Sequence, residues 1–126
     1  MKTIWIAAVL LTVVVVGSIA LFFYTGALYT GLQENLERLY RAVEGEDWAE
    51  AGQQSGRLQK IWAQTDAAWT PIMDHHQVDR LDESLTRVFK LVELRNREEL
   101  LLELTLAGRM AQRVKDSEVP MLRNIF

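Results

Sequence analysis

The chain opens with a long apolar run that carries no charge. Every residue from Thr3 to Gln33 is uncharged, and the apolar run itself extends from Ile4 to Tyr24. At roughly 1.5 Å per residue, this run makes a helix about 30 Å long, which matches the hydrocarbon core of a bilayer. Trp5 near one end and Tyr24 near the other are rings that favour the headgroup level. The pattern therefore predicts a transmembrane helix.

Two other interpretations of this run are the core helix of a soluble protein and a cleaved signal peptide. The rest of the chain is short, which leaves little protein to surround a core helix. Thr25, Gly26 and Ala27 resemble a small-residue cleavage site, but the run is longer than the roughly 7–15 residues of a secretory apolar region. We expect residues 1–27 to be retained as a membrane anchor and residues 28–126 to form a separate helical domain.

The charges around the run bear on its orientation. Lys2 and the α-amine make the N-terminal side positive, whereas the other flank mixes Arg38 and Arg41 with several acidic residues. A short positive N-terminus before a long apolar run typically stays in the cytoplasm. We therefore expect a single-pass protein of the cell membrane whose C-terminal domain is extracytoplasmic.

Beyond Gly31 the apolar positions recur with helical spacing. Leu32, Leu36, Leu39 and Val43 form one stripe, which predicts a stalk helix that continues the anchor. Gly26 and Gly31 are the positions where this helix could bend. The polar stretch 44–47 ends it, and Asp47 with Glu50 three residues later resembles a capping box that starts the next helix.

The second helix has the clearest pattern. Trp48, Ser55, Trp62 and Trp69 are seven residues apart, which predicts a stripe of large rings that pack in a core. The tryptophans could instead line a ligand groove, so Trp48, Trp62 and Trp69 remain candidate partner or groove residues. A stripe of small residues runs beside them and predicts close approach of a neighbouring helix backbone: Ala49, Gly52, Gly56, Ala63 and Ala67.

Pro71 predicts a kink or stop within a turn of Trp69. Two further stripes follow, separated by a break at Arg95 and Asn96. The first comprises Val78, Leu81, Leu85, Val88, Phe89 and Val92, and the second comprises Leu100, Leu104, Ala107, Ala111 and Val114. Pro120 is expected to end the last helix, and the apolar tail residues Met121, Leu122, Ile125 and Phe126 are expected to dock on the bundle. Short breaks between long helices favour antiparallel neighbours. The fold class is therefore all-α, with a transmembrane helix followed by an antiparallel up-and-down bundle of three helices plus the stalk.

One cluster of titratable residues lies at the start of the third helix. His75, Asp79 and Glu83 fall four residues apart on one helical face, which makes them candidates for a metal site. The plainer interpretation is that Asp74 caps the helix and a histidine bonds the loop or a carboxylate. A contact with a partner, or a response to pH, is a further hypothesis for His76.

Composition narrows the function. The absence of cysteine excludes disulfides, thiolate metal sites and cysteine nucleophiles. All 17 acidic residues and every basic residue except Lys2 lie beyond Gln33, so that region is mildly acidic and nucleic acid is not an expected partner. No serine lies in a nucleophile motif and no phosphate-binding glycine loop occurs. We expect neither enzymatic activity nor a cofactor.

The order of features resembles a bacterial family known as domain of unknown function 4363. The resemblance rests on the N-terminal apolar run, Asp47-Trp48, the paired Trp62 and Trp69, a histidine followed by Asp79, and Asn124-Ile125-Phe126. The acid that usually follows the histidine two residues later is replaced here by Gln77 or Val78. The resemblance implies a short membrane-anchored helical protein, with no established activity and with a membrane protein as partner.

The leading hypothesis is an accessory or interaction module that binds another membrane or envelope protein. The alternative is a small-molecule or metal sensor at the membrane surface. Homodimerisation through the stalk is a third possibility.

Overall fold

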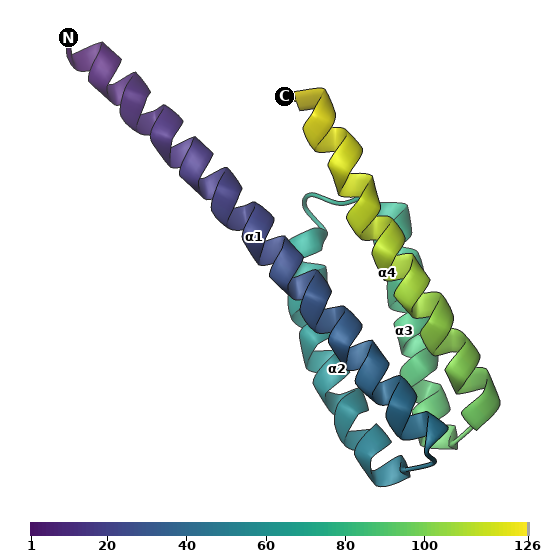
Figure 1. Cartoon of the computed structure of the whole chain (residues 1–126). Coiled ribbons are helices and arrows are strands. Elements are labelled where there is room, and N and C mark those ends of the chain that lie inside the picture. Colours follow the sequence, from purple (N-terminus) through teal and green to yellow (C-terminus); the bar gives the residue numbers. More distant parts are fainter. Residues whose placement is uncertain (126) are drawn as a thin grey trace.

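The computed structural model describes the backbone of residues 1–125 and the side chains through Asp116. Within these residues the chain forms four helices and no strand, so the predicted all-α class is confirmed (Figure 1). The helices are α1 (Lys2–Glu44), α2 (Trp48–Trp69), α3 (His75–Leu94) and α4 (Arg97–Ile125).

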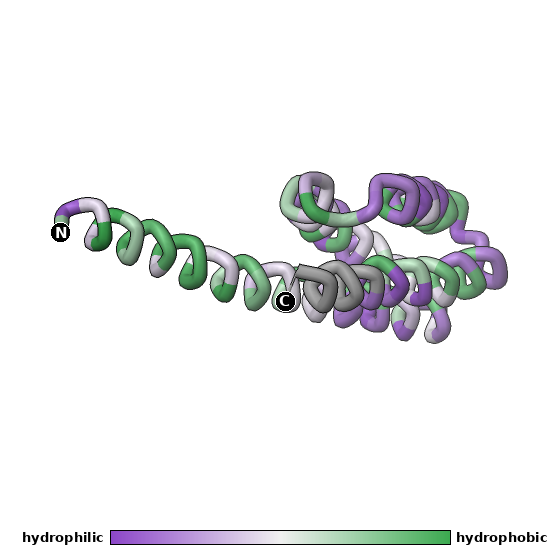
Figure 2. The backbone as a smooth tube through the Cα atoms, turned by 90° about the horizontal axis from the view of Figure 1, so that it is seen from above, coloured by the Kyte–Doolittle hydropathy of each residue, from purple (hydrophilic) through white to green (hydrophobic). Residues whose placement is uncertain are grey.

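The first helix contains two chemically different halves. No side chain before Thr25 is buried, although nearly all of them are apolar. Among the described residues, α1 is the one helix that is long and apolar enough to cross a membrane. Figure 2 shows its first half projecting from the rest of the molecule as a hydrophobic rod. The helix continues without a break through Gly26 and Gly31, where the sequence allowed a bend.

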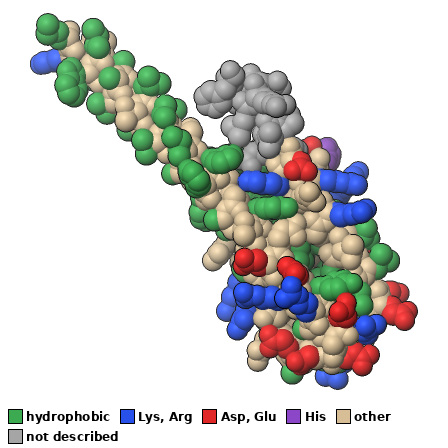
Figure 3. Space-filling view, viewed as in Figure 1, with side chains coloured by type: hydrophobic (Ala, Val, Ile, Leu, Met, Phe, Trp, Pro, Cys, Tyr) green, Lys and Arg blue, Asp and Glu red, His purple; other side chains and the backbone are tan. Residues whose placement is uncertain are grey.

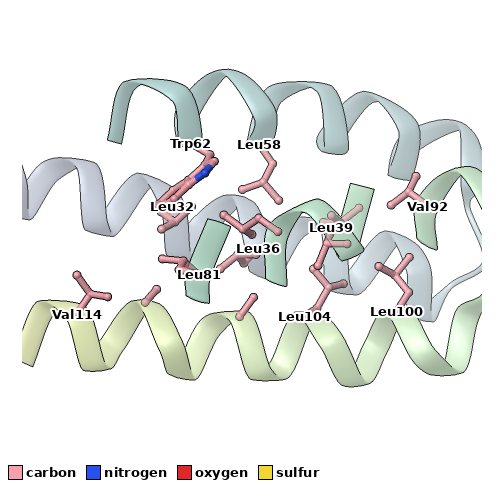
Figure 4. Packing of buried hydrophobic residues seen from close by; sticks show 14 of the residues in the cluster. Leu32, Leu36, Leu39, Leu58, Trp62, Leu81, Val92, Leu100, Leu104 and Val114 are labelled. Carbon is pink, nitrogen blue, oxygen red and sulfur yellow. The ribbon is translucent and has the colours of Figure 1, made fainter. Parts of the chain in front are cut away.

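The second half of α1 forms part of the core of the bundle. Helix α1 contacts α2 and α4, and α3 also contacts α2 and α4. Figure 4 shows side chains from all four helices pointing toward one another in this core. The predicted stripes of α1, α3 and α4 are buried, apart from Phe89, which is half-buried. These stripes end up inside because burial of aliphatic side chains is the main term that holds helices together.

The predicted N-caps of α2 and α3 are both present. The Asp47 side chain accepts a hydrogen bond from the Glu50 backbone N at 3.2 Å, and the Asp74 side chain accepts one from the His76 backbone N at 2.9 Å. The capping box at α2 is only half formed, because the Glu50 carboxylate accepts from Gln54 Nε2 at 2.9 Å. The Asp47 amide that it would have satisfied donates instead to the Ala42 carbonyl at 2.9 Å.

The turns after α1 and α3, at the end of the bundle remote from the apolar half of α1, have left-handed backbone at residues other than glycine. Glu46, after α1, has φ 56°, and Arg95, after α3, has φ 53°. Both residues close a helix end where glycine is usually found, since glycine alone adopts this conformation without steric cost. Gly45 itself has a negative φ.

The prediction for the small residues of α2 is wrong. Gly52 and Gly56 are exposed, and a Cβ placed on either would meet nothing within 4 Å. Ala49, Ala63 and Ala67 are exposed as well. The tryptophan stripe occupies the side of α2 that faces the bundle, so the adjacent small residues face solvent and no backbone approaches them.

The two prolines behave differently. α2 ends at Trp69, which confirms the predicted stop before Pro71. The prediction that Pro120 ends the last helix is wrong, because α4 continues to Ile125. A proline removes one backbone donor and crowds the preceding turn, and a helix can kink there instead of ending. The docking predicted for the side chains of Met121, Leu122, Ile125 and Phe126 lies outside the described residues.

Candidate interaction surfaces

The titratable cluster of α3 lies on the surface. His75, Asp79 and Glu83 are all exposed along the first two turns of the helix. The described residues contain no group of three histidines or acids placed to hold a metal ion. His76 is exposed too, and its backbone amide is the group that Asp74 caps. The Asp74 cap of the plainer interpretation is therefore present, whereas the hydrogen bond that it predicted from a histidine side chain to the loop or to a carboxylate is not found among the described residues.

Two of the three tryptophans of α2 lie in the core. Trp62 is 5% exposed and Trp69 is fully buried, and their rings meet edge to face with centroids 6.3 Å apart. Trp62 Nε1 donates to Asp82 Oδ1 of α3 at 2.8 Å. Trp48 is half-buried against the same core. A groove lined by Trp62 and Trp69 is therefore absent from the described part of the chain, and these rings join α2 to α3 instead.

A polar contact between α3 and α4 was not anticipated from the sequence. Glu103 accepts a hydrogen bond from Ser84 Oγ at 2.8 Å and an ion-paired one from Arg87 Nε at 2.8 Å. Ser84 is fully buried. The signal for this contact was available, because Ser84 sits between Leu81 and Leu85 on an otherwise apolar face. A hydroxyl on such a face usually finds a partner on the facing helix.

An open cleft of about 300 Å³ lies between α1 and α4. Its lining residues are Gln33, Leu36, Glu37, Tyr40, Leu104, Thr105 and Gly108. Gln33 Nε2 closes one end by donating to the Gly108 carbonyl at 2.9 Å and to the Tyr29 hydroxyl at 3.3 Å. None of the tryptophans lines this cleft.

The outer face of α4 exposes apolar side chains. Leu102 is 62% exposed and Leu106 is 39% exposed, although both lie outside the core stripe of the same helix. Exposed acids precede these leucines and exposed arginines follow them at spacings of three and four, which places them all on one helical face: Glu98, Glu99, Leu102, Leu106, Arg109 and Arg113. From Glu98 to Arg113 the face therefore changes from acidic through apolar to basic, and the exposed Asp116 follows on the same face.

The ends of this face differ in their distance from the apolar run. Arg97 Nη2 donates to the Glu44 carbonyl at 3.2 Å, so the acidic end lies beside the end of α1 that is remote from the run. The basic end lies closer to the run, because Lys115 Nζ lies 5.4 Å from the centroid of the Phe22 ring. Figure 3 shows that charged side chains gather on the bundle, whereas the projecting half of α1 is almost wholly hydrophobic. The charge pattern of α4 is thus ordered along the axis of the bundle.

Comparison with known proteins identifies a family. The chain matches no curated protein and no solved structure. One family model, described as "Domain of unknown function (DUF4363)", matches residues 19–125 and so includes the second half of α1 and all of α2, α3 and α4. The match begins at residue 19, so most of the projecting apolar half of α1 lies before it. The chain belongs to this DUF4363 family, as its motifs suggested.

Proposed function

We propose that this protein is a single-pass membrane protein whose antiparallel, up-and-down helical bundle is a non-catalytic interaction module. The observation that carries the proposal is the outer face of α4, where Leu102 and Leu106 are exposed between acidic and basic residues. Exposed leucines flanked by ordered charges are typical of surfaces that bind other proteins. The partner is another membrane or envelope protein, because the bundle is held at the bilayer.

The anchoring half of the proposal is supported by the first half of α1. A helix that is apolar on every side needs an apolar solvent, and no part of the described bundle covers it. Extraction of membranes with alkaline carbonate tests whether the full chain is integral. A chain that is released, or that has lost its first residues, would contradict retention of the anchor and support a cleaved signal peptide.

The orientation of the bundle is part of the same proposal. Lys2 on the N-terminal side favours a cytoplasmic N-terminus and an extracytoplasmic bundle. Protease added to intact spheroplasts is then expected to degrade the bundle. Full protection of the bundle, with degradation only after lysis, would reverse the orientation.

The charge order of α4 favours a partner other than a second copy. Two copies anchored in one membrane stand parallel, so Glu98 and Glu99 of one copy would meet the same acids of the other at equal height. Like charges placed opposite one another disfavour association. A partner helix with basic residues far from the membrane and acidic residues near it would complement this face. The leucine stripe of the stalk is buried within the bundle and is not exposed for pairing with a second copy.

Site-specific photocrosslinking in living cells tests the surface. A photoreactive residue at Leu102 should crosslink to one membrane or envelope protein, whereas the same residue at Gln59 on α2 serves as the exposed control. The variant E98K/E99K should weaken that crosslink, and the matched variant E83K on α3 should not. The proposal would be contradicted if positions 102 and 59 gave the same crosslinked products. It would also be contradicted if E98K/E99K left the crosslink from position 102 unchanged. Deletion of the anchor should also abolish co-purification of the partner.

A small-molecule sensor is the second candidate, and the cleft between α1 and α4 favours it. Tyr40 lines this cleft, so its fluorescence or its chemical shift would report a ligand there. The variant T105W would fill the cleft with the indole ring. Loss of ligand binding in this variant would support the sensor function. Binding that persists in that variant would place the ligand elsewhere.

A further inference from the structure

The turn between α2 and α3 lies at the same end of the bundle as the apolar run. Helix α2 starts beside the end of α1 and contains 22 residues. At about 1.5 Å per residue it therefore extends roughly 33 Å back along α1. This length brings Trp69 to the level of Phe22 and Phe23, where the apolar run ends. Figure 1 places the α2–α3 turn beside the middle of α1, in agreement with this estimate.

Helix α4 reaches the same level from the other side. Its contacts with α1 progress from Glu44, through the Gln33–Gly108 hydrogen bond of 2.9 Å, to Lys115. Lys115 Nζ lies 5.4 Å from the centroid of the Phe22 ring and 5.9 Å from that of Tyr29. A Cβ on Gly26 would lie 3.4 Å from the same nitrogen. The ammonium group is therefore fixed over α1 at the boundary between its apolar and polar halves.

The groups at this boundary suit the interface of a bilayer. Pro71 is exposed in the α2–α3 turn, and Ile72 beside it is 36% exposed, although Met73 in the same turn is buried. The Lys115 ammonium group itself lies over the rings of Phe22 and Tyr29, at the depth where lysine side chains snorkel toward lipid phosphates. Tyr24 is 52% exposed at this level, where tyrosine is enriched in membrane proteins.

We propose that this end of the bundle rests on the lipid surface, with Pro71 and Ile72 inserted among the headgroups and Lys115 at the level of the phosphates. This inference rests on the proposed function, because it requires that the first half of α1 spans the bilayer. The contact does not need anionic lipid, since Asp74 and Asp116 are exposed beside the turn and beside Lys115 and offset its charge. The bundle thus stands against the membrane, with its α2–α3 turn as a second point of attachment.

The lack of cysteine allows a direct test in the full chain. Single cysteines at three positions, I72C, L94C and V14C, would each carry a bimane fluorophore in protein reconstituted into phosphatidylcholine vesicles. Nitroxide-bearing lipids then quench each fluorophore according to its depth. Leu94 is the matched control, because it is also an exposed aliphatic residue at a helix end but lies at the far end of the bundle. Val14 reports whether α1 is inserted.

The expected result is quenching at position 72 several-fold greater than at position 94, with the strongest quenching by headgroup and shallow-chain nitroxides. Equal quenching at positions 72 and 94, with strong quenching at position 14, would overturn the lipid contact while leaving the anchor intact. Lack of quenching at position 14 would overturn the anchor and, with it, this inference.

A second pair of variants tests Lys115. K115Q in the I72C background should reduce quenching at position 72, whereas K60Q on the surface of α2 should leave it unchanged. Equal quenching in the two variants would overturn the assignment of Lys115 to the phosphates. Circular dichroism of both proteins would establish that the bundle remains folded, so that a loss of quenching reports contact.

Discussion

The two halves of α1 have the same backbone and opposite surroundings. In the first half, Leu11 is 66% exposed and Val14 is 63% exposed, and their neighbours around the helix are equally uncovered. In the second half, Leu32 and Leu39 are fully buried by the other helices, while Arg38 on the same helix faces solvent. One helix therefore combines a segment that is apolar on every side with a segment that has one apolar stripe.

This difference shows that the pattern of apolar residues, more than their number, decides what surrounds a helix. A stripe is buried by protein partners, because only one side must be covered. A helix that is apolar all round is covered most completely by lipid, which has no preferred side. The first half should consequently tolerate exchange among apolar residues, whereas the second half should depend on the shape of each side chain.

The largest expected effect comes from making the same truncation in both halves. L39A removes a fully buried side chain and should lower the free energy of unfolding of the bundle by about 2–5 kcal/mol. L11A removes an exposed side chain and should leave the stability of the bundle unchanged. Denaturant unfolding of both variants in mild detergent, followed by circular dichroism, measures the difference. Equal losses in the two variants would contradict the division of α1.

The second prediction concerns a charge in the first half. V14R places a guanidinium near the middle of the apolar run, where it should disfavour membrane insertion by about 2.5–3.5 kcal/mol. The fraction of protein that floats with membranes in a density gradient should fall, while V14L should float as the original protein does. If V14R floated to the same extent as V14L, this result would argue against a membrane span.

The third prediction tests whether the bundle depends on specific contacts. Trp62 Nε1 donates a hydrogen bond to Asp82 Oδ1 at 2.8 Å, and a hydrogen bond to a charged group usually contributes about 1.5–3 kcal/mol. A double-mutant cycle of W62F and D82A in denaturant unfolding should therefore give a coupling energy of that size. D82N retains an acceptor and should recover part of the loss. Strict additivity of W62F and D82A would show that the contact contributes nothing.

The smallest effect is expected at a turn. Arg95 has φ 53°, a conformation that suits glycine better than arginine. R95G should raise the midpoint of thermal unfolding by a few degrees, corresponding to about 1 kcal/mol or less. R57G, at an exposed residue inside α2, is the control and should lower the midpoint, because glycine inside a helix costs about 1 kcal/mol. A lower midpoint in R95G would show that the Arg95 side chain stabilises the folded protein by more than the left-handed backbone conformation destabilises it.

The helices and their buried faces were predictable because each rests on local information. Aliphatic residues recur at helical spacing from Leu32 to Val43, and a break follows at once. Asp47 and Asp74 each cap a helix through a side chain a few residues from the amide that it bonds. Pro71 likewise acts on its own turn. Such features need no knowledge of distant parts of the chain.

The interpretations that failed required knowledge of how the helices face one another. Gly52 and Gly56 suggested that a neighbouring helix packs closely against them. The tryptophan stripe faces the bundle instead, and these glycines lie on the solvent side of α2. The bond between Ser84 and Glu103 joins residues that only the packing of α3 on α4 brings together. The charge order of α4 could be read from the sequence, but its exposure was decided by which stripe of α4 the bundle covered.

Because α1 is one continuous helix, its apolar half and the bundle are expected to tilt together. The helix passes from its apolar half into the bundle without a hinge at Gly26 or Gly31. A tilt of about 10° in the apolar half would carry the far end of the bundle, roughly 30 Å away, sideways by about 5 Å. If the apolar half spans a bilayer as proposed, a change in bilayer thickness or a contact with that half would thereby move the charged face of α4 toward or away from a neighbouring protein.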